Sequence, residues 1–175
     1  MNSETKKRLI VFAGKPGVGK STIIEAVRGG WVYIDVWHFM VPLIGASDAF
    51  PAEDKNILAY EAAYEYLSAL ALPRVILEIG TNYPELASAE LVRLSTQYEI
   101  DILLCHVPLD ICWERLAKRG YRTAGKGIEQ RLGRDFPNIF IQHAEKTPLR
   151  YHLVDTSGSV DSVCRKVHAR FFAKN

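Results

Sequence analysis

A glycine-rich octapeptide near the start of the chain has the residue types and spacing of a phosphate-binding loop. Residues 14–21 read GKPGVGKS and match the pattern G-x-x-x-x-G-K-[S/T]. Glycines let backbone N–H groups turn toward phosphate oxygens, and a helix that starts after the loop adds the positive end of its dipole. In this pattern Lys20 reaches the β- and γ-phosphates, and the Ser21 hydroxyl binds Mg²⁺. The residues predicted to hold a nucleoside triphosphate are Gly14, Lys15, Pro16, Gly17, Val18, Gly19, Lys20, Ser21 and Thr22.

The sequence on either side of the loop supports this interpretation. The apolar, partly β-branched run Leu9–Ala13 precedes it and is typical of a buried strand. Residues 22–27 predict a helix that Gly29 and Gly30 close. The alternative is a glycine-rich turn that matches by accident, which composition alone would produce in about one chain per hundred of this length. The strand and helix context lowers that rate further.

Five short apolar segments are predicted to be buried parallel strands, because helix-length sequence separates each from the next. They are Arg8–Ala13, Trp31–Val36, Arg74–Ile79, Ile100–Val107 and Tyr151–Asp155. This alternation indicates an α/β fold with helices on both faces of the sheet. Ligands bind at the carboxyl ends of the strands in such folds. Besides the loop, the residues that stand there are Asp35, Glu78, Ser157 and Gly158.

Three further helices are predicted from capping residues and periodicity. Asp110 is expected to cap a helix that runs to Lys118 and stops at Gly120. Pro84 is expected to start a helix that continues toward Gln97. In the last helix, a core-facing stripe at helical spacing is predicted for Val160, Val163, Cys164, Val167 and Phe171.

The chain resembles the small P-loop kinases that phosphorylate metabolites, such as shikimate and gluconate kinases, and the kinase domain of polynucleotide kinases. The loop, Asp35 within Tyr33–His38, and the segment Leu153–Gly158 carry the resemblance. It implies a P-loop NTPase three-layer sandwich with strand order 2-3-1-4-5, a mobile lid at about 115–134 and an acceptor-binding insert at about 37–73. It also implies that Ser157 and Gly158 border the adenine.

The resemblance places Asp35 beside the acceptor hydroxyl, and the residues agree with that role. Phosphoryl transfer needs a carboxylate that orients the attacking hydroxyl and takes its proton. Asp35 ends an apolar strand next to the loop, so we expect its carboxylate to face the cleft; the alternative is a cap on the following helix. Members of the family often carry a second acid two residues earlier, which assists the metal. Here that residue is Tyr33.

Glu78 closes the third predicted strand, where the family layout places an acid that contacts Mg²⁺ through water. Contact with the acceptor and a purely structural role are the two alternatives. Gly80 and Asn82 follow in a turn that we expect to face the cleft and contact the substrate.

The predicted lid is rich in basic residues, which suits the charge that develops on a transferred phosphoryl group. The resemblance to the lid of nucleotide and metabolite kinases matches Arg115 and Arg119 with two arginines of that lid. The first of them stacks on adenine, and the second holds phosphate. We expect Arg119 to be catalytic and Arg115 and Arg122 to bind the nucleotide. The alternative for some of these charges is a solvated helix face.

The predicted acceptor insert contains a single basic residue, Lys55, against five acids. Acceptors that carry a phosphate or carboxylate need arginines to hold that anion, so we expect a neutral or cationic hydroxyl compound. Stacking surfaces and polar contacts are expected from His38, Tyr60 and Tyr64. Two alternatives stay open. Aromatic side chains at helical spacing commonly pack in a core, and Arg74 or Arg93 can reach in from outside the insert.

Composition sets the remaining expectations. With 175 residues, 48% apolar, the chain fits one domain, and 22 basic against 20 acidic residues give no argument for a nucleic-acid partner. No apolar run approaches the ~18 residues that a membrane span needs, and no apolar signal core follows Met1, so we expect a cytoplasmic protein, monomeric or homodimeric. Three cysteines without a C-x-x-C pair predict reduced thiols and no zinc site.

These features predict an ATP- and Mg²⁺-dependent kinase with a small-molecule acceptor. A GTPase would carry D-x-x-G after the third strand and a guanine motif, and a motor ATPase would usually end that strand with two acids; this chain has neither pattern. The remaining alternatives are a non-catalytic ATP-binding regulatory module and a nucleotide or polynucleotide 5′-hydroxyl kinase. The insert lacks the basic, aromatic groove that a nucleic-acid strand needs.

Overall fold

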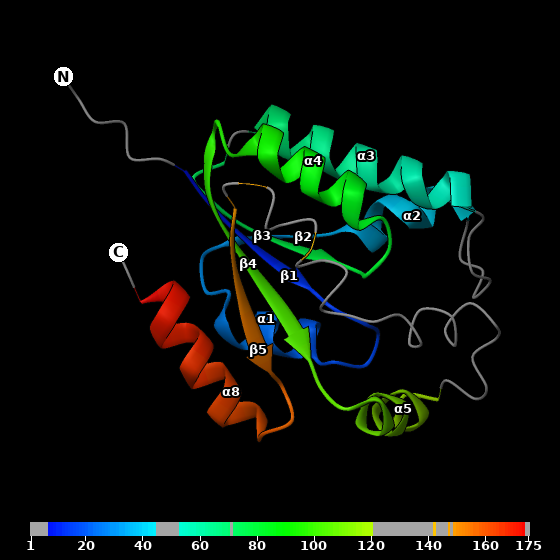
Figure 1. Ribbon diagram of the computed structural model, residues 1–175, viewed down its shortest axis with the longest axis vertical. Helices are drawn as coiled ribbons and strands as arrows, with labels where there is room; N and C mark the ends of the chain where they lie inside the picture. The colour runs from blue at the N-terminus through cyan, green and yellow to red at the C-terminus, as the bar shows by residue number, and fades with distance from the viewer. Residues whose placement is uncertain are drawn as a thin grey trace.

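A five-stranded parallel sheet forms the centre of the structure (Figure 1). The computed structural model describes residues 7–44, 53–70, 72–120, 142, 147 and 149–173. The strand order is β2-β3-β1-β4-β5, and every neighbouring pair is parallel. The predicted fold class and strand order are therefore confirmed. The strands are β1 (Lys7–Ala13), β2 (Val32–Asp35), β3 (Arg74–Ile79), β4 (Tyr98–His106) and β5 (Arg150–Asp155).

Helices cover both faces of the sheet, because each strand turns alternate side chains to opposite sides. In β1, Leu9 and Val11 pack into one core cluster, whereas Ile10 and Phe12 pack into a second. The first cluster includes residues of α2 (Val36–Ile44), α3 (Glu53–Leu70) and α4 (Pro84–Leu94). The second includes residues of α1 (Lys20–Val27), α5 (Leu109–Lys118), α8 (Val160–Val167) and the π-helical turn η1 (His168–Phe172).

The structure corrects three details of the predicted helices. Pro108, not Asp110, is the N-cap of α5, and Asp110 lies in the first turn, where its charge suits the helix dipole. α4 starts at Pro84 as predicted but ends at Leu94, because Ser95 caps it. Val160 is 51% exposed and does not belong to the core stripe of α8.

Parts of the predicted lid and insert lie outside the described residues. These parts are residues 45–52 and 71 of the insert and 121–134 of the lid, so Arg122 is among the site residues on which the structure gives no information. Among the helices that are described, none combines the length and the apolar character needed to cross a membrane.

Candidate active site

The glycine-rich loop connects β1 to α1 and rests directly on neighbouring backbone. A Cβ atom on Gly14 would lie 2.7 Å from the carbonyl oxygen of Cys105, at the end of β4. Gly17 has φ +82°, and a Cβ atom there would lie 2.8 Å from the carbonyl oxygen of Cys112 in α5. Only glycine allows this close seating, so the loop is fixed against both elements.

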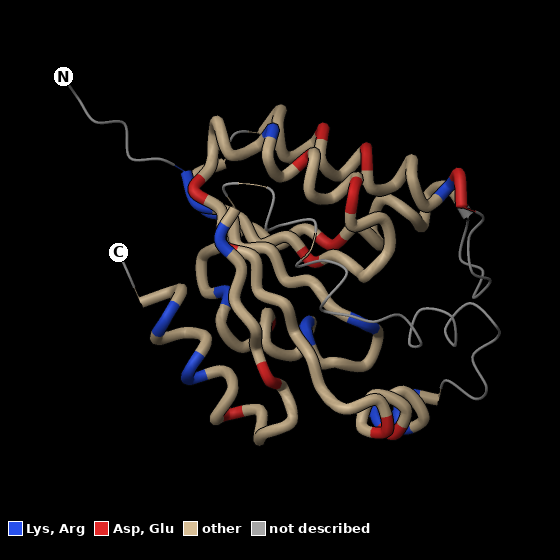
Figure 2. Tube along the Cα trace, viewed as in Figure 1, with Lys and Arg blue, Asp and Glu red and all other residues tan. Residues whose placement is uncertain are grey.

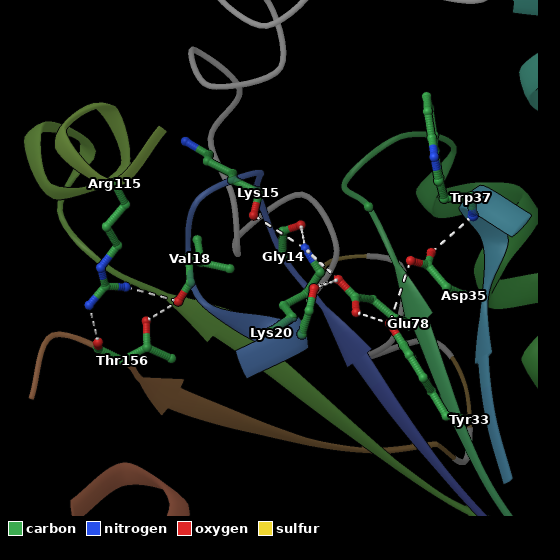
Figure 3. A network of polar contacts seen from close by, with 12 residues as sticks. Gly14, Lys15, Val18, Lys20, Tyr33, Asp35, Trp37, Glu78, Arg115 and Thr156 are labelled. Atoms are coloured by element: carbon green, nitrogen blue, oxygen red, sulfur yellow. Dashed lines mark hydrogen bonds and ion pairs between the residues drawn. The ribbon is translucent and has the colours of Figure 1, made fainter. Parts of the chain in front are cut away.

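Hydrogen bonds to the carbonyl of Val18 hold the other side of the loop (Figure 3). The Thr156 hydroxyl donates to this oxygen at 2.6 Å, and Arg115 Nη1 donates to it at 3.1 Å. Arg115 Nη2 also donates to the carbonyl of Thr156 at 2.8 Å. The segment after β5 and helix α5 are thereby tied to the loop. Sequence reasoning pointed to the two residues that follow Thr156 and missed Thr156 itself.

Lys20 projects its ammonium group back over the loop. Its Nζ donates to the carbonyls of Gly14 at 2.9 Å and Lys15 at 3.3 Å, and it lies 3.6 Å from Glu78 Oε1. The residue is 8% exposed. A buried positive charge therefore stands between the loop backbone and a carboxylate.

Two carboxylates meet at the carboxyl ends of β2 and β3, where Asp35 pairs with Glu78 in the strand register. Glu78 Oε1 accepts from the Ser21 hydroxyl at 3.1 Å, and Oε2 accepts from the Tyr33 hydroxyl at 2.6 Å. The Tyr33 hydroxyl also lies 3.5 Å from Asp35 Oδ2. Asp35 Oδ1 accepts from the backbone N–H of Trp37 at 2.9 Å, so Asp35 caps α2 while it also lines a cavity beside the loop. Figure 3 shows these side chains converging from the loop and the two strands.

The surroundings of this cluster shift the protonation of two of its members. Burial, followed by the charge of Glu78, raises the pKa of the Asp35 carboxyl above its ordinary value, although the Trp37 N–H partly opposes the shift. Burial and the hydrogen bond to Glu78 raise the pKa of Tyr33 well above the usual tyrosine range. Tyr33 is therefore a neutral donor between two acids.

The donors beside Lys20 fit a magnesium ion that is shared with phosphates. Ser21 Oγ and Glu78 Oε1 are hard oxygen donors 3.1 Å apart. Mg²⁺ in nucleotide sites commonly keeps one or two protein groups, with phosphate oxygens and water completing an octahedron. In the part of the chain that the structure describes, no group of three or more His, Cys, Asp or Glu residues could hold a metal. The pair of oxygen donors fits an ion whose remaining ligands come from phosphates and water.

A cavity of about 270 Å³ runs from the loop past the two carboxylates to the turn after β3. Of the predicted acceptor residues, it is lined by Asp35, Tyr60, Gly80 and Asn82. The Tyr60 hydroxyl accepts from the backbone N–H of Gly80 at 3.1 Å and so connects α3 to this turn. The cavity also reaches Thr81, which belongs to the turn expected to face the cleft. Its buried hydroxyl has no hydrogen-bond partner among the described residues.

Two predicted acceptor residues lie elsewhere. Tyr64 is 0% exposed and packs in the core between the sheet and α3, so the packing alternative describes it better than a pocket role. His38 is exposed and does not line the cavity; its ring lies 6.3 Å from that of Tyr33. The exposed indole of Trp37 stands at the cavity in its place.

The described lining of the cavity beside Asp35 carries little positive charge. Lys20 is the one basic residue among the described residues that line it. Arg74 begins β3, at the opposite end of the strand from Glu78. Arg93 donates to Glu90 at 2.8 Å and to Ser68 at 3.1 Å, beside a different hollow between α3 and α4. Acidic residues recur along these two helices (Figure 2).

A second cavity, of about 280 Å³, lies on the other side of the loop. Arg115 of α5 and Arg119, the C-cap of that helix, line it together with Gly158, whereas Ser157 does not. The backbone N–H of Ser157 instead donates to Asp155 Oδ1 at 2.9 Å. Val160 also faces this cavity, which explains its exposure. In this structure Arg119 thus stands with the second cavity and not with the Lys20 cluster.

Solved structures of small-molecule kinases share this fold. A sugar kinase from Janibacter sp. HTCC2649 is 14% identical, covers 93% of each chain and gives a TM-score of 0.66. A shikimate kinase from Acinetobacter baumannii, in complex with shikimate, is 17% identical over 93% of this chain and 92% of its own, with a TM-score of 0.61. A gluconokinase from Sinorhizobium meliloti 1021 is 18% identical over 95% and 92%, with a TM-score of 0.58.

At such low identities these likenesses establish the fold, which is the one that the resemblance implied. No protein-family profile matches the chain, and no curated protein sequence matches it.

Proposed function

We propose that this protein is an ATP- and Mg²⁺-dependent phosphotransferase that moves the γ-phosphoryl group to a hydroxyl of a small neutral or cationic molecule. One observation carries the proposal. Lys20 and Ser21 of the loop converge on Glu78, and Asp35 stands beside Glu78 on a cavity that starts at the loop. A phosphate donor held by the loop would have its terminal phosphate facing an acid and a space for an alcohol.

Each side chain has a role that follows from its position. Lys20 covers the charge of the β- and γ-phosphates, and release of its bonds to Gly14 and Lys15 frees its donors for them. Ser21 and Glu78 hold the magnesium ion that accompanies the nucleotide. Asp35 orients the acceptor hydroxyl and takes its proton. Its raised pKa brings the basicity of this carboxylate closer to neutral pH, which favours a general base.

The second cavity is our candidate for the adenine and ribose. The Arg115 guanidinium is held by two carbonyls and can offer a flat cationic face to a base. Gly158 supplies a wall without a side chain. Arg119 lines the same cavity and is exposed, so we propose that it reaches the phosphates after nucleotide binding, together with Arg122.

The cavity beside Asp35 supports the proposed class of acceptor. Its described lining offers amides, hydroxyls and one indole, with two carboxylates and no arginine. An acceptor with its own phosphate or carboxylate would meet net negative charge there. Neutral polyols and amino alcohols are the compounds that this lining suits.

Substitutions of Lys20 and Asp35 test the proposal through ATP consumption with a panel of neutral, amine-bearing and acidic alcohols. Lys20→Ala should lower kcat about 10²- to 10³-fold through loss of one preorganised donor. Asp35→Asn should lower it about 10²- to 10⁴-fold with ATP affinity nearly unchanged in calorimetry. Lys166→Ala and Asp161→Asn, on the exposed face of α8, are the matched controls.

The outcomes separate the alternatives. ATP binding without acceleration by any alcohol would favour the regulatory module, and selective turnover of an acidic acceptor would contradict the proposed acceptor class. Full activity of Asp35→Asn would overturn the assignment of the base.

A further inference from the structure

The Tyr33 hydroxyl occupies a position between the two carboxylates of the cluster. It donates to Glu78 Oε2 at 2.6 Å and lies 3.5 Å from Asp35 Oδ2. Tyr33 and Asp35 are two residues apart in β2, so their side chains leave the same face of the strand. The phenol therefore reaches along the sheet edge toward the oxygen of Glu78 that Ser21 does not contact.

Packing fixes where this hydroxyl stands. The ring of Tyr33 is half-buried against the core cluster beneath α1 and α8. Its other neighbour is the ring of His38, edge-on at a centroid distance of 6.3 Å. A tyrosine held along its ring has little freedom to move its hydroxyl, so the donor is presented to Glu78 at a set place.

We propose that Tyr33 is a positioning residue, which holds Glu78 so that Oε1 faces Ser21 and the cation of a bound nucleotide. This inference rests on the proposed function. A donor on Oε2 fixes the rotation of the carboxylate and leaves Oε1 directed to Ser21 Oγ at 3.1 Å and Lys20 Nζ at 3.6 Å.

A neutral phenol at position 33 avoids charge repulsion within the cluster. An acid at position 33 would add a third negative charge beside Asp35 and Glu78, which already lie next to each other in the register. Tyr33 orients the carboxylate without adding charge. In this proposal, the hydrogen bond from Tyr33 orients Glu78 toward the metal. It takes the place of the second acid that the resembled kinases often carry at this position.

Tyr33→Phe tests the inference, because it removes only the hydroxyl and keeps the packed ring. Mn²⁺ is used as the probe and its binding is followed by electron paramagnetic resonance, in the presence of a non-hydrolysable ATP analogue. Outer partners that orient a metal ligand typically contribute 10- to 100-fold in metal affinity, so we expect a loss of about that size. Affinity for the analogue in EDTA should stay unchanged. Tyr98→Phe is the control, since it removes a buried hydroxyl that donates to the Leu67 carbonyl at 3.3 Å.

A double-mutant cycle distinguishes positioning from a general structural effect. If Tyr33 acts through Glu78, adding Tyr33→Phe to Glu78→Gln should cause no further loss of Mn²⁺ affinity. An unchanged Mn²⁺ affinity in Tyr33→Phe, or the same loss in both backgrounds, would overturn the inference and leave the proposed function standing. A wild-type protein that binds no nucleotide would overturn both.

Discussion

Two buried carboxylates of the sheet, Asp101 in β4 and Glu78 in β3, have contrasting surroundings. Asp101, in β4, is 6% exposed and accepts two hydrogen bonds from Arg150, at 3.1 and 3.2 Å. It also lies 3.0 Å from His152 Nε2 and 3.6 Å from Arg8. Glu78 is 7% exposed but has one cation, Lys20 at 3.6 Å, and stands beside a second acid.

The difference separates a carboxylate whose charge is compensated within the protein from one that, in the proposed function, would be compensated by a bound cation. Several donors surround Asp101, so its burial is compensated within the protein. Among the described residues, Glu78 and Asp35 share one ammonium group and two hydroxyls, so this part of the site carries excess negative charge. A cation brought by a ligand would complete it, which is how functional sites commonly trade stability for binding.

The largest change in stability is expected from a substitution that removes the charge of Asp101. Asp101→Asn should lower the free energy of unfolding by about 2–4 kcal/mol, because Arg8 loses this carboxylate partner and Arg150 is left with Glu99, at 2.8 Å. The value is below that of a fully buried pair, since the Arg150 side chain is 51% exposed. Urea unfolding measures the change, and Glu114→Gln, in an exposed pair with Lys118, is the control. A loss no greater than that of the control would remove the contrast.

A change of opposite sign in the free energy of unfolding is expected for a substitution beside Glu78. Asp35→Asn should raise the free energy of unfolding by about 0.5–2 kcal/mol, in the range of substitutions that relieve a functional site of strain. It removes one of two neighbouring negative charges and keeps an oxygen that can accept from the Trp37 N–H. The same urea experiment measures it. If Asp35→Asn is as destabilising as Asp101→Asn, the two carboxylate clusters do not differ in the way described.

The smallest expected effect is the pH dependence of the stability that Asp35→Asn gains over the wild-type protein. The pKa of Asp35 is raised in the folded protein, so the folded state holds its proton more tightly than the unfolded state does. Wild-type stability should therefore fall as pH rises from the ordinary aspartate pKa of about 4 through the raised value, relative to Asp35→Asn. Urea midpoints of both proteins between pH 4 and 8 should diverge with rising pH and then run parallel. Convergence with rising pH would contradict the sign.

Local patterns predicted most of the fold. The β3 segment Arg74–Ile79 was predicted at its observed bounds, and the other strands fall within two residues, because apolar runs separated by helix-length sequence leave few arrangements. The convergence of Lys20 and Ser21 on Glu78 also follows, since the loop after β1 and the end of the adjacent strand β3 lie at the same edge of the sheet.

The remaining details depend on contacts between distant segments. Periodicity treats Tyr60 and Tyr64 alike, but one lines the cavity and the other is fully buried. The bond from Thr156 to Val18 joins residues 138 positions apart, for which no local signal exists. One signal was present: Asp101 lies within the apolar run Ile100–Cys105 of β4, and a buried acid needs partners.

The two bonds to the Val18 carbonyl have a consequence for how the loop meets a nucleotide. Rotation of this peptide would break the bonds from both Thr156 and Arg115, and in a trans peptide the Gly19 N–H points opposite to that oxygen. The amide is therefore aimed before any ligand arrives. Little conformational entropy remains to be lost at this point of the loop, so more of the contact energy is retained as affinity.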